Sequence, residues 1–277
     1  MQMKSLLIFI LLIIFNSGCS QKPIDVAIIT IKGSDSMLLL TENLAQEYMK
    51  QNPEVSIYVS GGGTAAGIQS LIRGDVDICT ASRNLKPEET KSLAEYYGSV
   101  GLFYLVAKDA LCIYVNPYNP VKYLSLENLR KIFECKITDW SELGGKHQKI
   151  IPVIRNLNSG THLYFKEHVL EGAEYCDEAV IEATTPEIID YIERNKNAIG
   201  YGSIGYKGNV ANVKIDGVEP SEINAQNDTY PITRYLHFFT ANVPKGIVKK
   251  FIDWVLSPDG QRVVKQSGFI PLWEITY

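Results

Sequence analysis

Three short segments of the chain place glycine beside hydroxyl side chains, each where a strand-like run meets a helix-like run. They are residues 33–36, 60–64 and 159–161, with the sequences Gly-Ser-Asp-Ser, Ser-Gly-Gly-Gly-Thr and Ser-Gly-Thr. A helix N-terminus offers unpaired N–H groups and the positive end of the helix dipole, and glycine lets a ligand approach the backbone. Its natural ligand is an oxyanion. One such junction is better explained as a helix cap, but three in one chain favour an anion site.

Arg155 supplies the formal positive charge that an anion site without a metal needs. It stands four residues before Ser159, at the end of the apolar run 150–154. Its planar guanidinium directs several donors at a tetrahedral oxyanion. Most arginines form surface salt bridges, so it is the neighbouring Ser-Gly-Thr segment that makes Arg155 a candidate ligand.

Nucleotide binding and catalysis are weaker interpretations. Residues 61–66 fit the relaxed pattern G-x-G-x-x-A, but Gly67 is not followed by the lysine of a phosphate-gripping loop. Ser159 lacks the G-x-S-x-G motif of a hydrolase. The histidines show neither an H-E-x-x-H motif nor a regular metal-ligand spacing: His147, His162, His168 and His237. The residues therefore indicate binding without a metal, while a ligand-sensing domain of a signalling system stays open.

The elements that must position these residues alternate between strand and helix. Strand-like runs at 26–31 and 55–59 flank a helix-like run at 37–51, whose apolar residues recur every three or four positions. A further strand is expected from residue 76, and further helices at 66–73, after Pro87, at 187–194 and at 259–266, the last two opened by Thr185-Pro186-Glu187 and Ser257-Pro258-Asp259. This alternation is typical of an α/β fold.

Composition excludes several classes of protein. The 277 residues are 45% hydrophobic and 21% charged, which is close to a globular average and gives one or two domains. The net charge is −4, so nucleic acid is not an expected partner.

The first residues predict a secretory leader. Lys4 precedes an apolar run at 6–15, and the small residues Ser17 and Gly18 come before Cys19. Ten apolar residues are about half of the ~20 that a transmembrane helix needs. Residues 1–18 are therefore interpreted as a signal peptide, and the end of the leader resembles a bacterial lipoprotein box with Cys19 as the lipidated residue. Asn16 stands where leucine is usual, and an ordinary secretory leader is the alternative.

The remaining cysteines divide into two kinds. Cys79 and Cys112 lie inside apolar runs, where a free thiol behaves as a small core residue. Cys135 and Cys176 lie in more polar stretches, and an exported protein could oxidise them. The sequence leaves this disulfide open, with free thiols as the favoured reading.

Taken together, several stretches resemble the phosphate-binding lipoprotein of bacterial phosphate ABC importers. The similarity runs from about residue 31 to residue 272. It is carried by residues 33–37 (GSDSM), 61–64 (GGGT), 75–78 (DVDI) with 81–83 (ASR), 137–140 (ITDW), Arg155 with 159–161 (SGT), 199–201 (IGY) and 256–260 (LSPDG). Agreement over so many separate stretches is not expected by chance.

The resemblance implies a type II periplasmic-binding-protein fold, in which two α/β lobes joined by two hinge strands close over the anion. Residues 24–108 plus 233–277 are expected to form lobe 1 and residues 109–232 lobe 2. The strands that cross between the lobes are expected near 106–111 and 230–235.

The resemblance also implies a ligand set. It falls on Ser34, Ser36, the backbone N–H of Met37, Thr64, Ser82, Arg83, Arg155, Ser159, Gly160 and Thr161. Arg83 stands where some members have an aspartate that accepts the proton of phosphate, and Leu157 stands where an acid can hold the arginine. Arg83 is predicted as a second cationic ligand, with pairing to an acid as the competing role. Asp35 is the nearest replacement for the missing acceptor.

The function that the resemblance implies is that of a substrate-binding component, not an enzyme. It would bind inorganic phosphate and deliver it to a membrane permease, outside the cytoplasm and held to the membrane by the lipid on Cys19. No cofactor, metal or nucleic acid is expected. Another tetrahedral oxyanion, such as sulfate or arsenate, and a phosphate-sensing domain are the alternatives.

Overall fold

The computed structural model describes residues 26–274. The predicted leader and Cys19 lie outside the described residues. Among the described residues, no helix is both long and apolar enough to cross a membrane.

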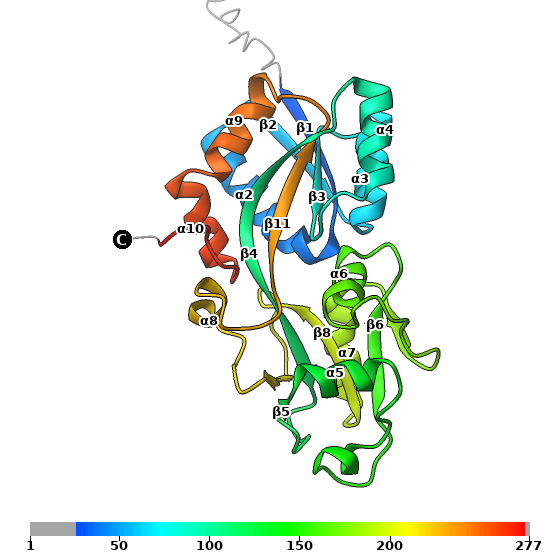
Figure 1. Ribbon diagram of the computed structural model, residues 1–277. Coiled ribbons are helices and arrows are strands. Elements are labelled where there is room, and N and C mark those ends of the chain that lie inside the picture. The colour runs from blue at the N-terminus through cyan, green and yellow to red at the C-terminus, as the bar shows by residue number, and fades with distance from the viewer. Residues whose placement is uncertain (1–25, 275–277) are drawn as a thin grey trace, which may run out of the picture.

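The molecule has two α/β lobes, and the strands β4 (Leu102–Val115) and β11 (Thr233–Thr240) run from one to the other (Figure 1). β4 pairs with β11 from Leu102 to Ala110, and then with β8 (Ala198–Ser203) from Leu111 to Val115. One curled sheet therefore continues through both lobes, in the order β2-β1-β3-β11-β4-β8-β6-β7, with β9 beside β4. This confirms the two-lobed α/β fold with two crossing strands.

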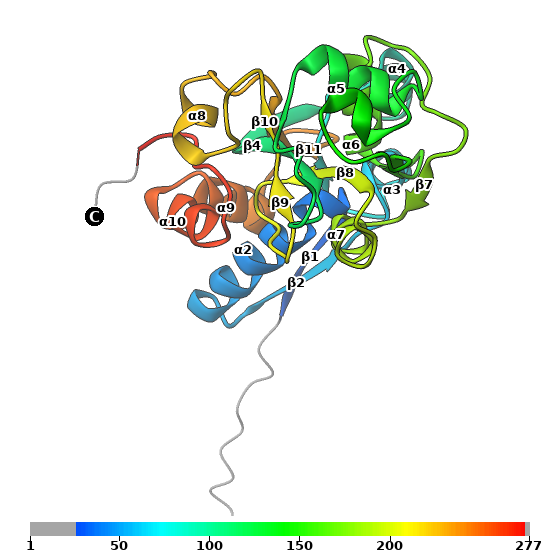
Figure 2. The same ribbon diagram turned by 90° about the horizontal axis from the view of Figure 1, so that it is seen from below.

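The upper lobe of Figure 1 is built from both ends of the chain. Its sheet is parallel where β1 lies between β2 and β3, and antiparallel where β11 joins β3. Seen from below in Figure 2, α9 and α10 from the C-terminal part lie beside α2 from the N-terminal part. Its elements are β1 (Ala27–Gly33), a 3-10 turn η2 (Asp35–Met37), α2 (Leu38–Gln51), β2 (Val55–Ser60), α3 (Thr64–Arg73), β3 (Ile78–Ala81), α4 (Pro87–Tyr97), α9 (Gly246–Val255) and α10 (Pro258–Gln266).

The lower lobe lies between β4 and β11 in the sequence. Its core is rich in aromatic rings, including the buried Phe133, Phe165 and Tyr201. Its elements are β5 (Tyr123–Leu124), α5 (Leu126–Phe133), η3 (Trp140–Leu143), β6 (Ile151–Arg155), α6 (Gly160–His168), β7 (Val180–Glu182), α7 (Thr185–Arg194), β8, β9 (Ala211–Asn212), β10 (Lys214–Ile215) and α8 (Glu222–Gln226).

Hydroxyl side chains cap helices as expected, but some helices begin one or two residues away from the predicted position. Ser257 is the N-cap of α10, and its hydroxyl accepts from the backbone N–H of Gly260, as predicted. α7 is capped by Thr184, one residue before the predicted Thr185, because the hydroxyl of Thr184 reaches the backbone N–H of Glu187. α3 begins at Thr64, two residues earlier than expected, which places this threonine in the first helical turn.

The cysteines of the described residues are of two kinds, buried free thiols and a disulfide pair. Cys79 and Cys112 are buried free thiols, as predicted, and burial raises the pKa of both. Cys135 and Cys176 form a disulfide between the end of α5 and the segment before β7. The sequence had favoured free thiols here, since it could not show that residues 41 positions apart meet in space.

Candidate anion-binding cleft

The three hydroxyl-rich junctions converge between the lobes. The Oγ of Ser36 lies 2.7 Å from the Oγ1 of Thr161, which belongs to the opposite lobe. Ser34 donates to the Oγ of Ser82 at 3.1 Å, and Thr64 Oγ1 lies 3.5 Å from the same Ser82 atom. All five side chains are buried. The fold therefore gathers hydroxyls from distant parts of the chain into one buried cluster.

Two glycines allow the lobes to approach this closely. A Cβ on Gly160 would lie 2.4 Å from Thr64 Oγ1 and 2.6 Å from Ser82 Oγ, so no side chain fits there. Gly63 has a φ of 91°, which favours glycine, and a Cβ on it would meet the carbonyl oxygen of Asn158 at 2.4 Å. At these two positions the absence of a side chain lets the two lobes come into close contact.

Arg155 is fully buried at the end of β6. Its Nε donates to the carbonyl oxygen of Ala183 at 3.0 Å, and its Nη1 to Thr185 Oγ1 at 3.4 Å. Its Nη2 meets Asp35 Oδ2 of the opposite lobe at 3.1 Å. Burial lowers the pKa of Arg155, and the Asp35 carboxylate opposes that shift. A guanidinium stays charged under these conditions, so the cleft holds a desolvated cation.

Asp35 pairs with Arg155. It replaces the acid that is absent at position 157, two residues after Arg155. Leu157 itself is 85% exposed, and its apolar side chain cannot form an ion pair with Arg155. Asp35 Oδ1 accepts the backbone N–H of Gly62 at 2.7 Å, while Oδ2 faces Arg155. The acid that holds the arginine therefore comes from the other lobe, and in the sequence it stands between Ser34 and Ser36 of the hydroxyl cluster.

The N-terminus of α6 and the turn at Met37 partly satisfy their own donors. Ser159 is the N-cap of α6, and its Oγ accepts from the backbone N–H groups of Thr161 and His162. The backbone N–H of Met37 bonds to the carbonyl oxygen of Ser34 at 3.0 Å. Both predicted positions therefore lie at the cleft, with these groups engaged in local bonds.

Arg83 is buried next to Ser82 and is paired with an acid of its own lobe. Its guanidinium forms two bonds with Glu89, at 2.7 and 2.8 Å, and donates to the carbonyl oxygen of Asn84 at 2.7 Å. Glu89 also accepts the backbone N–H of Lys86 at the start of α4. Arg83 thus has the competing role, pairing with an acid, because the carboxylate of the first turn of α4 faces it.

A buried ion pair that was not predicted from the sequence joins the crossing strands. Arg234 of β11 donates through Nε to Asp109 Oδ2 of β4 at 3.0 Å, and through Nη1 to the carbonyl oxygen of Ser82 at 3.4 Å. Its guanidinium also lies 5.4 Å from the centre of the Tyr164 ring. Arg234 therefore contacts both lobes. Charged residues within two otherwise apolar crossing runs were the signal that could have found it.

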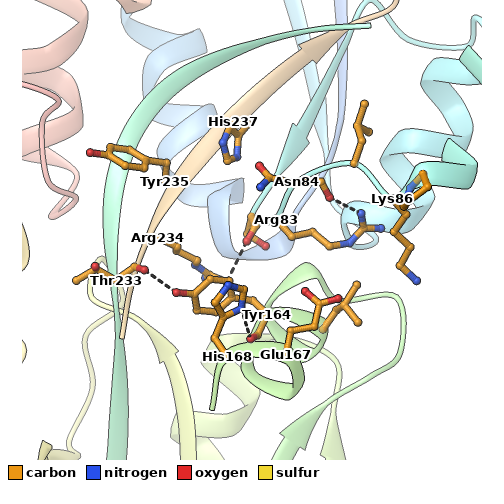
Figure 3. A pocket seen from close by; sticks show the side chains of 14 residues that line it. Arg83, Asn84, Lys86, Tyr164, Glu167, His168, Thr233, Arg234, Tyr235 and His237 are labelled. Atoms are coloured by element: carbon orange, nitrogen blue, oxygen red, sulfur yellow. Dashed lines mark hydrogen bonds between the residues drawn. The ribbon is translucent and has the colours of Figure 1, made fainter. Parts of the chain in front are cut away.

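A cavity of about 440 Å³ lies beside this pair (Figure 3). It is bounded by the loop after β3, by α6 and by β11, and Figure 3 shows Arg83 and Arg234 at separate places on its wall. His237 lines it as well, and burial lowers the pKa of His237 to about 4. Within residues 26–274, no group of three or more His, Cys, Asp or Glu side chains could hold a metal ion.

Comparison with known proteins agrees with the two-lobed α/β fold. A family model described as the PBP superfamily domain matches residues 20–259. The phosphate-binding protein PstS of Bacillus subtilis is 34% identical over 253 residues, covering 89% of this chain and 81% of the relative. PstS of Pseudomonas aeruginosa is 31% identical over 263 residues, covering 87% and 81%.

Solved structures give the same result. A substrate-binding protein of a phosphate ABC transporter from Clostridium perfringens, crystallised with bound phosphate, has a TM-score of 0.81 and 33% identity, covering 89% of this chain and 100% of that one. An ABC-type phosphate transport receptor from Vibrio cholerae has a TM-score of 0.73 and 29% identity, covering 87% and 99%. The fold and cleft are thus those of a two-lobed solute-binding protein. The chain belongs to the PBP superfamily and, within it, to the family of the PstS phosphate-binding proteins.

Proposed function

We propose that this chain is the substrate-binding component of a phosphate ABC importer, which binds inorganic phosphate between its lobes and delivers it to a membrane permease. The observation that carries the proposal is the buried Arg155, which pairs across the lobes with Asp35, while the adjacent Ser36 contacts Thr161 of the opposite lobe. An oxyanion leaves water only for a site with a cation and many oriented donors. The names of the relatives and the phosphate in the Clostridium perfringens protein support this ligand.

Binding would exchange contacts between the lobes for contacts with the anion. Ser36 and Thr161 bond each other across the cleft at 2.7 Å, and a tetrahedral anion can accept from both. Each hydrogen bond to a charged group contributes roughly 1.5 to 3 kcal/mol. Residues 24–108 plus 233–277 and residues 109–232 would separate to admit the anion and close over it, with β4 and β11 as the hinge.

The proposed ligand set omits one residue of the sequence-based set. It comprises Ser34, Ser36, Met37, Thr64, Ser82, Arg155, Ser159, Gly160 and Thr161. Arg83 is left out because Glu89 already neutralises it. Asp35 would accept the proton that phosphate carries near neutral pH, whereas sulfate has no such proton to donate. This favours phosphate over sulfate, and arsenate, which also carries a proton, would remain a competitor.

The protein is proposed to act outside the cytoplasm, bound to the membrane by a lipid on Cys19. The Cys135–Cys176 disulfide supports export, because such bonds persist in oxidising compartments. Its expected partners are inorganic phosphate, the permease and the membrane, with no cofactor, metal or nucleic acid. A Cys19→Ala protein should be released or left unprocessed, and lipid labelling that persists in it would contradict the anchor.

Calorimetric titration of the exported chain with phosphate tests the proposal most directly. Phosphate should bind tightly, and small-angle scattering should show that the protein is more compact with phosphate than without it. Absence of heat and of a thermal shift with phosphate, sulfate and arsenate would contradict anion binding. Turnover of a phosphoester would favour an enzyme instead.

A further inference from the structure

A directed chain of hydrogen bonds lies behind Arg155. The backbone N–H of Arg155 donates to the hydroxyl of Tyr201 at 3.3 Å, and this hydroxyl lies 3.0 Å from that of Tyr175. Tyr175 donates to the carbonyl oxygen of His162 at 2.9 Å. Because the one proton of Tyr175 goes to a carbonyl, Tyr201 must donate to Tyr175. We call Tyr175 and Tyr201 the tyrosine pair.

The chain closes on itself through His162. The Nδ1 of His162 lies 2.7 Å from the carbonyl oxygen of Arg155, and a carbonyl can only accept, so Nδ1 carries the proton. Both backbone groups of Arg155 are therefore held by this loop. His162 belongs to the first turn of α6, directly after Thr161. The loop thus sets the distance between Arg155 and the start of α6, which are the two main parts of the proposed anion site in this lobe.

The tyrosine pair is packed and stays protonated. The ring of Tyr201 stacks on Phe165 with centroids 4.2 Å apart, and the ring of Tyr175 lies 4.5 Å from that of His162. Burial raises the pKa of both tyrosines, that of Tyr201 to about 12. Neither hydroxyl ionises at physiological pH, so the direction of the hydrogen-bond chain is preserved.

Tyr175 is directly followed in the chain by a cysteine of the disulfide. Tyr175 lies between α6 and β7, in a segment that is neither helix nor strand. Its neighbour Cys176 is bonded to Cys135, and the backbone N–H of Cys176 donates to the carbonyl oxygen of Phe133 at 2.8 Å. The disulfide is thus the covalent link that ties this segment to the end of α5.

We propose that Tyr175 is a positioning residue of the anion site and that the Cys135–Cys176 disulfide sets its position, so that phosphate affinity depends on the redox state of this disulfide. The inference rests on the proposed phosphate binding. It extends that function by making the geometry of Arg155 depend on a bond outside the cleft.

The disulfide is accessible to a dithiol reductant. Cys135 is only half-buried and lines a cavity of about 330 Å³. A thiolate of the reductant attacks one sulfur to form a mixed disulfide, and its second thiol displaces the remaining cysteine. Cys135 and Cys176 end as thiols and the reductant as a cyclic disulfide, so two electrons and two protons are transferred.

The first test compares phosphate titrations of the oxidised and the fully reduced protein, with reduction by dithiothreitol verified by mass after alkylation. We expect the Kd to rise about tenfold on reduction, the effect of losing roughly one hydrogen bond. A Cys135→Ser, Cys176→Ser double variant should match the reduced protein and ignore the reductant. Equal affinity of the two redox forms would overturn the inference, whereas no binding by the oxidised protein would instead overturn the proposed function.

The second test isolates the hydroxyl of Tyr175. Tyr175→Phe keeps the ring and should weaken phosphate binding about as much as reduction does. Tyr230→Phe is the matched control, because the buried Tyr230 hydroxyl also donates to a carbonyl, that of Leu111 at 3.0 Å. Equal affinities of the two variants would overturn the positioning role, since both lose one buried hydroxyl in the core of the same lobe.

The third test uses the reciprocity of coupled equilibria. If the oxidised form binds phosphate ten times more tightly, saturating phosphate must lower the midpoint potential of the disulfide by about 30 mV. Tyr175→Phe should remove most of this shift. A purely structural disulfide would have the same potential with and without phosphate, and that result would contradict the inference.

Discussion

The two arginines predicted for the site, Arg155 and Arg83, are both buried and both paired with an acid, but only Arg155 takes its acid from the opposite lobe. Arg83 shares two hydrogen bonds with Glu89, a residue of the same lobe. Arg155 bonds mainly to a carbonyl and a hydroxyl, and its one acid, Asp35, belongs to the other lobe. If the lobes separate as proposed, Arg83 stays paired with Glu89, whereas Arg155 loses its acid. The lobe that supplies the partner acid, more than burial, is therefore the feature on which the proposed roles of Arg155 and Arg83 differ.

Replacement of Arg155 tests this difference most strongly. Arg155→Ala should reduce phosphate affinity by roughly 100-fold or more, because the anion would lose its charged donor inside the closed cleft. Arg130→Ala serves as the control, since Arg130 lies in the same lobe and bonds to Val169 and Glu171 away from the cleft. Calorimetry on both variants measures the effect. Similar affinities would show that Arg155 is not a ligand.

Replacement of Asp35 tests the acid that the other lobe supplies. Asp35→Asn keeps the shape of the side chain but removes its charge and weakens its ability to accept the proton of phosphate. We expect the affinity for sulfate relative to phosphate to rise about tenfold, as one charge-assisted hydrogen bond changes. Competition titrations with the two anions measure the ratio. An unchanged ratio would remove Asp35 from the discrimination between them.

Replacement of Arg83 should affect folding more than binding. Arg83→Ala leaves Glu89 buried without its partner, which costs about 3 to 5 kcal/mol of stability. Phosphate affinity should change by less than about threefold at a temperature where the variant is folded. Adding Glu89→Ala should recover part of the melting temperature. A tenfold loss of affinity in Arg83→Ala would restore this residue to the ligand set and erase the contrast with Arg155.

The smallest effect on binding is expected at His237, which lines the cavity on the Arg83 side. Its folded pKa of about 4 lies below the ordinary value of 6.5, because burial disfavours the charged form. The unfolded chain therefore binds this proton first, so stability present above pH 6.5 is lost as the pH falls from 6.5 towards 4. The loss reaches about 3 kcal/mol.

Urea unfolding at several pH values measures this loss. His237→Asn should remove that part of the pH dependence and leave phosphate affinity at pH 7 unchanged. The same pH dependence in the variant would show that other groups are responsible.

Local patterns predicted one part of the site, and the rest depends on tertiary pairing. The junctions at Ser36, Thr64 and Ser159 could be found because a helix start has a sequence pattern of its own. The Arg83–Glu89 pair could not be predicted from such a pattern. The N-cap of α4 is Lys86, which is not one of the usual capping residues, so the role of Glu89 at the helix start was not visible in the sequence. The Arg234–Asp109 pair joins strands 125 positions apart in the sequence.

The order of the strands in the sheet also affects how the chain can fold during synthesis. β11 lies between β3 and β4, although it follows both by more than a hundred residues in the sequence. A nascent chain that ends before Thr233 therefore presents two unpaired strand edges where the middle of the sheet should be, and exposed edges invite aggregation. The lower lobe, which is continuous in sequence, can complete its core first. Folding that waits until β11 is available would close the sheet without exposing these edges.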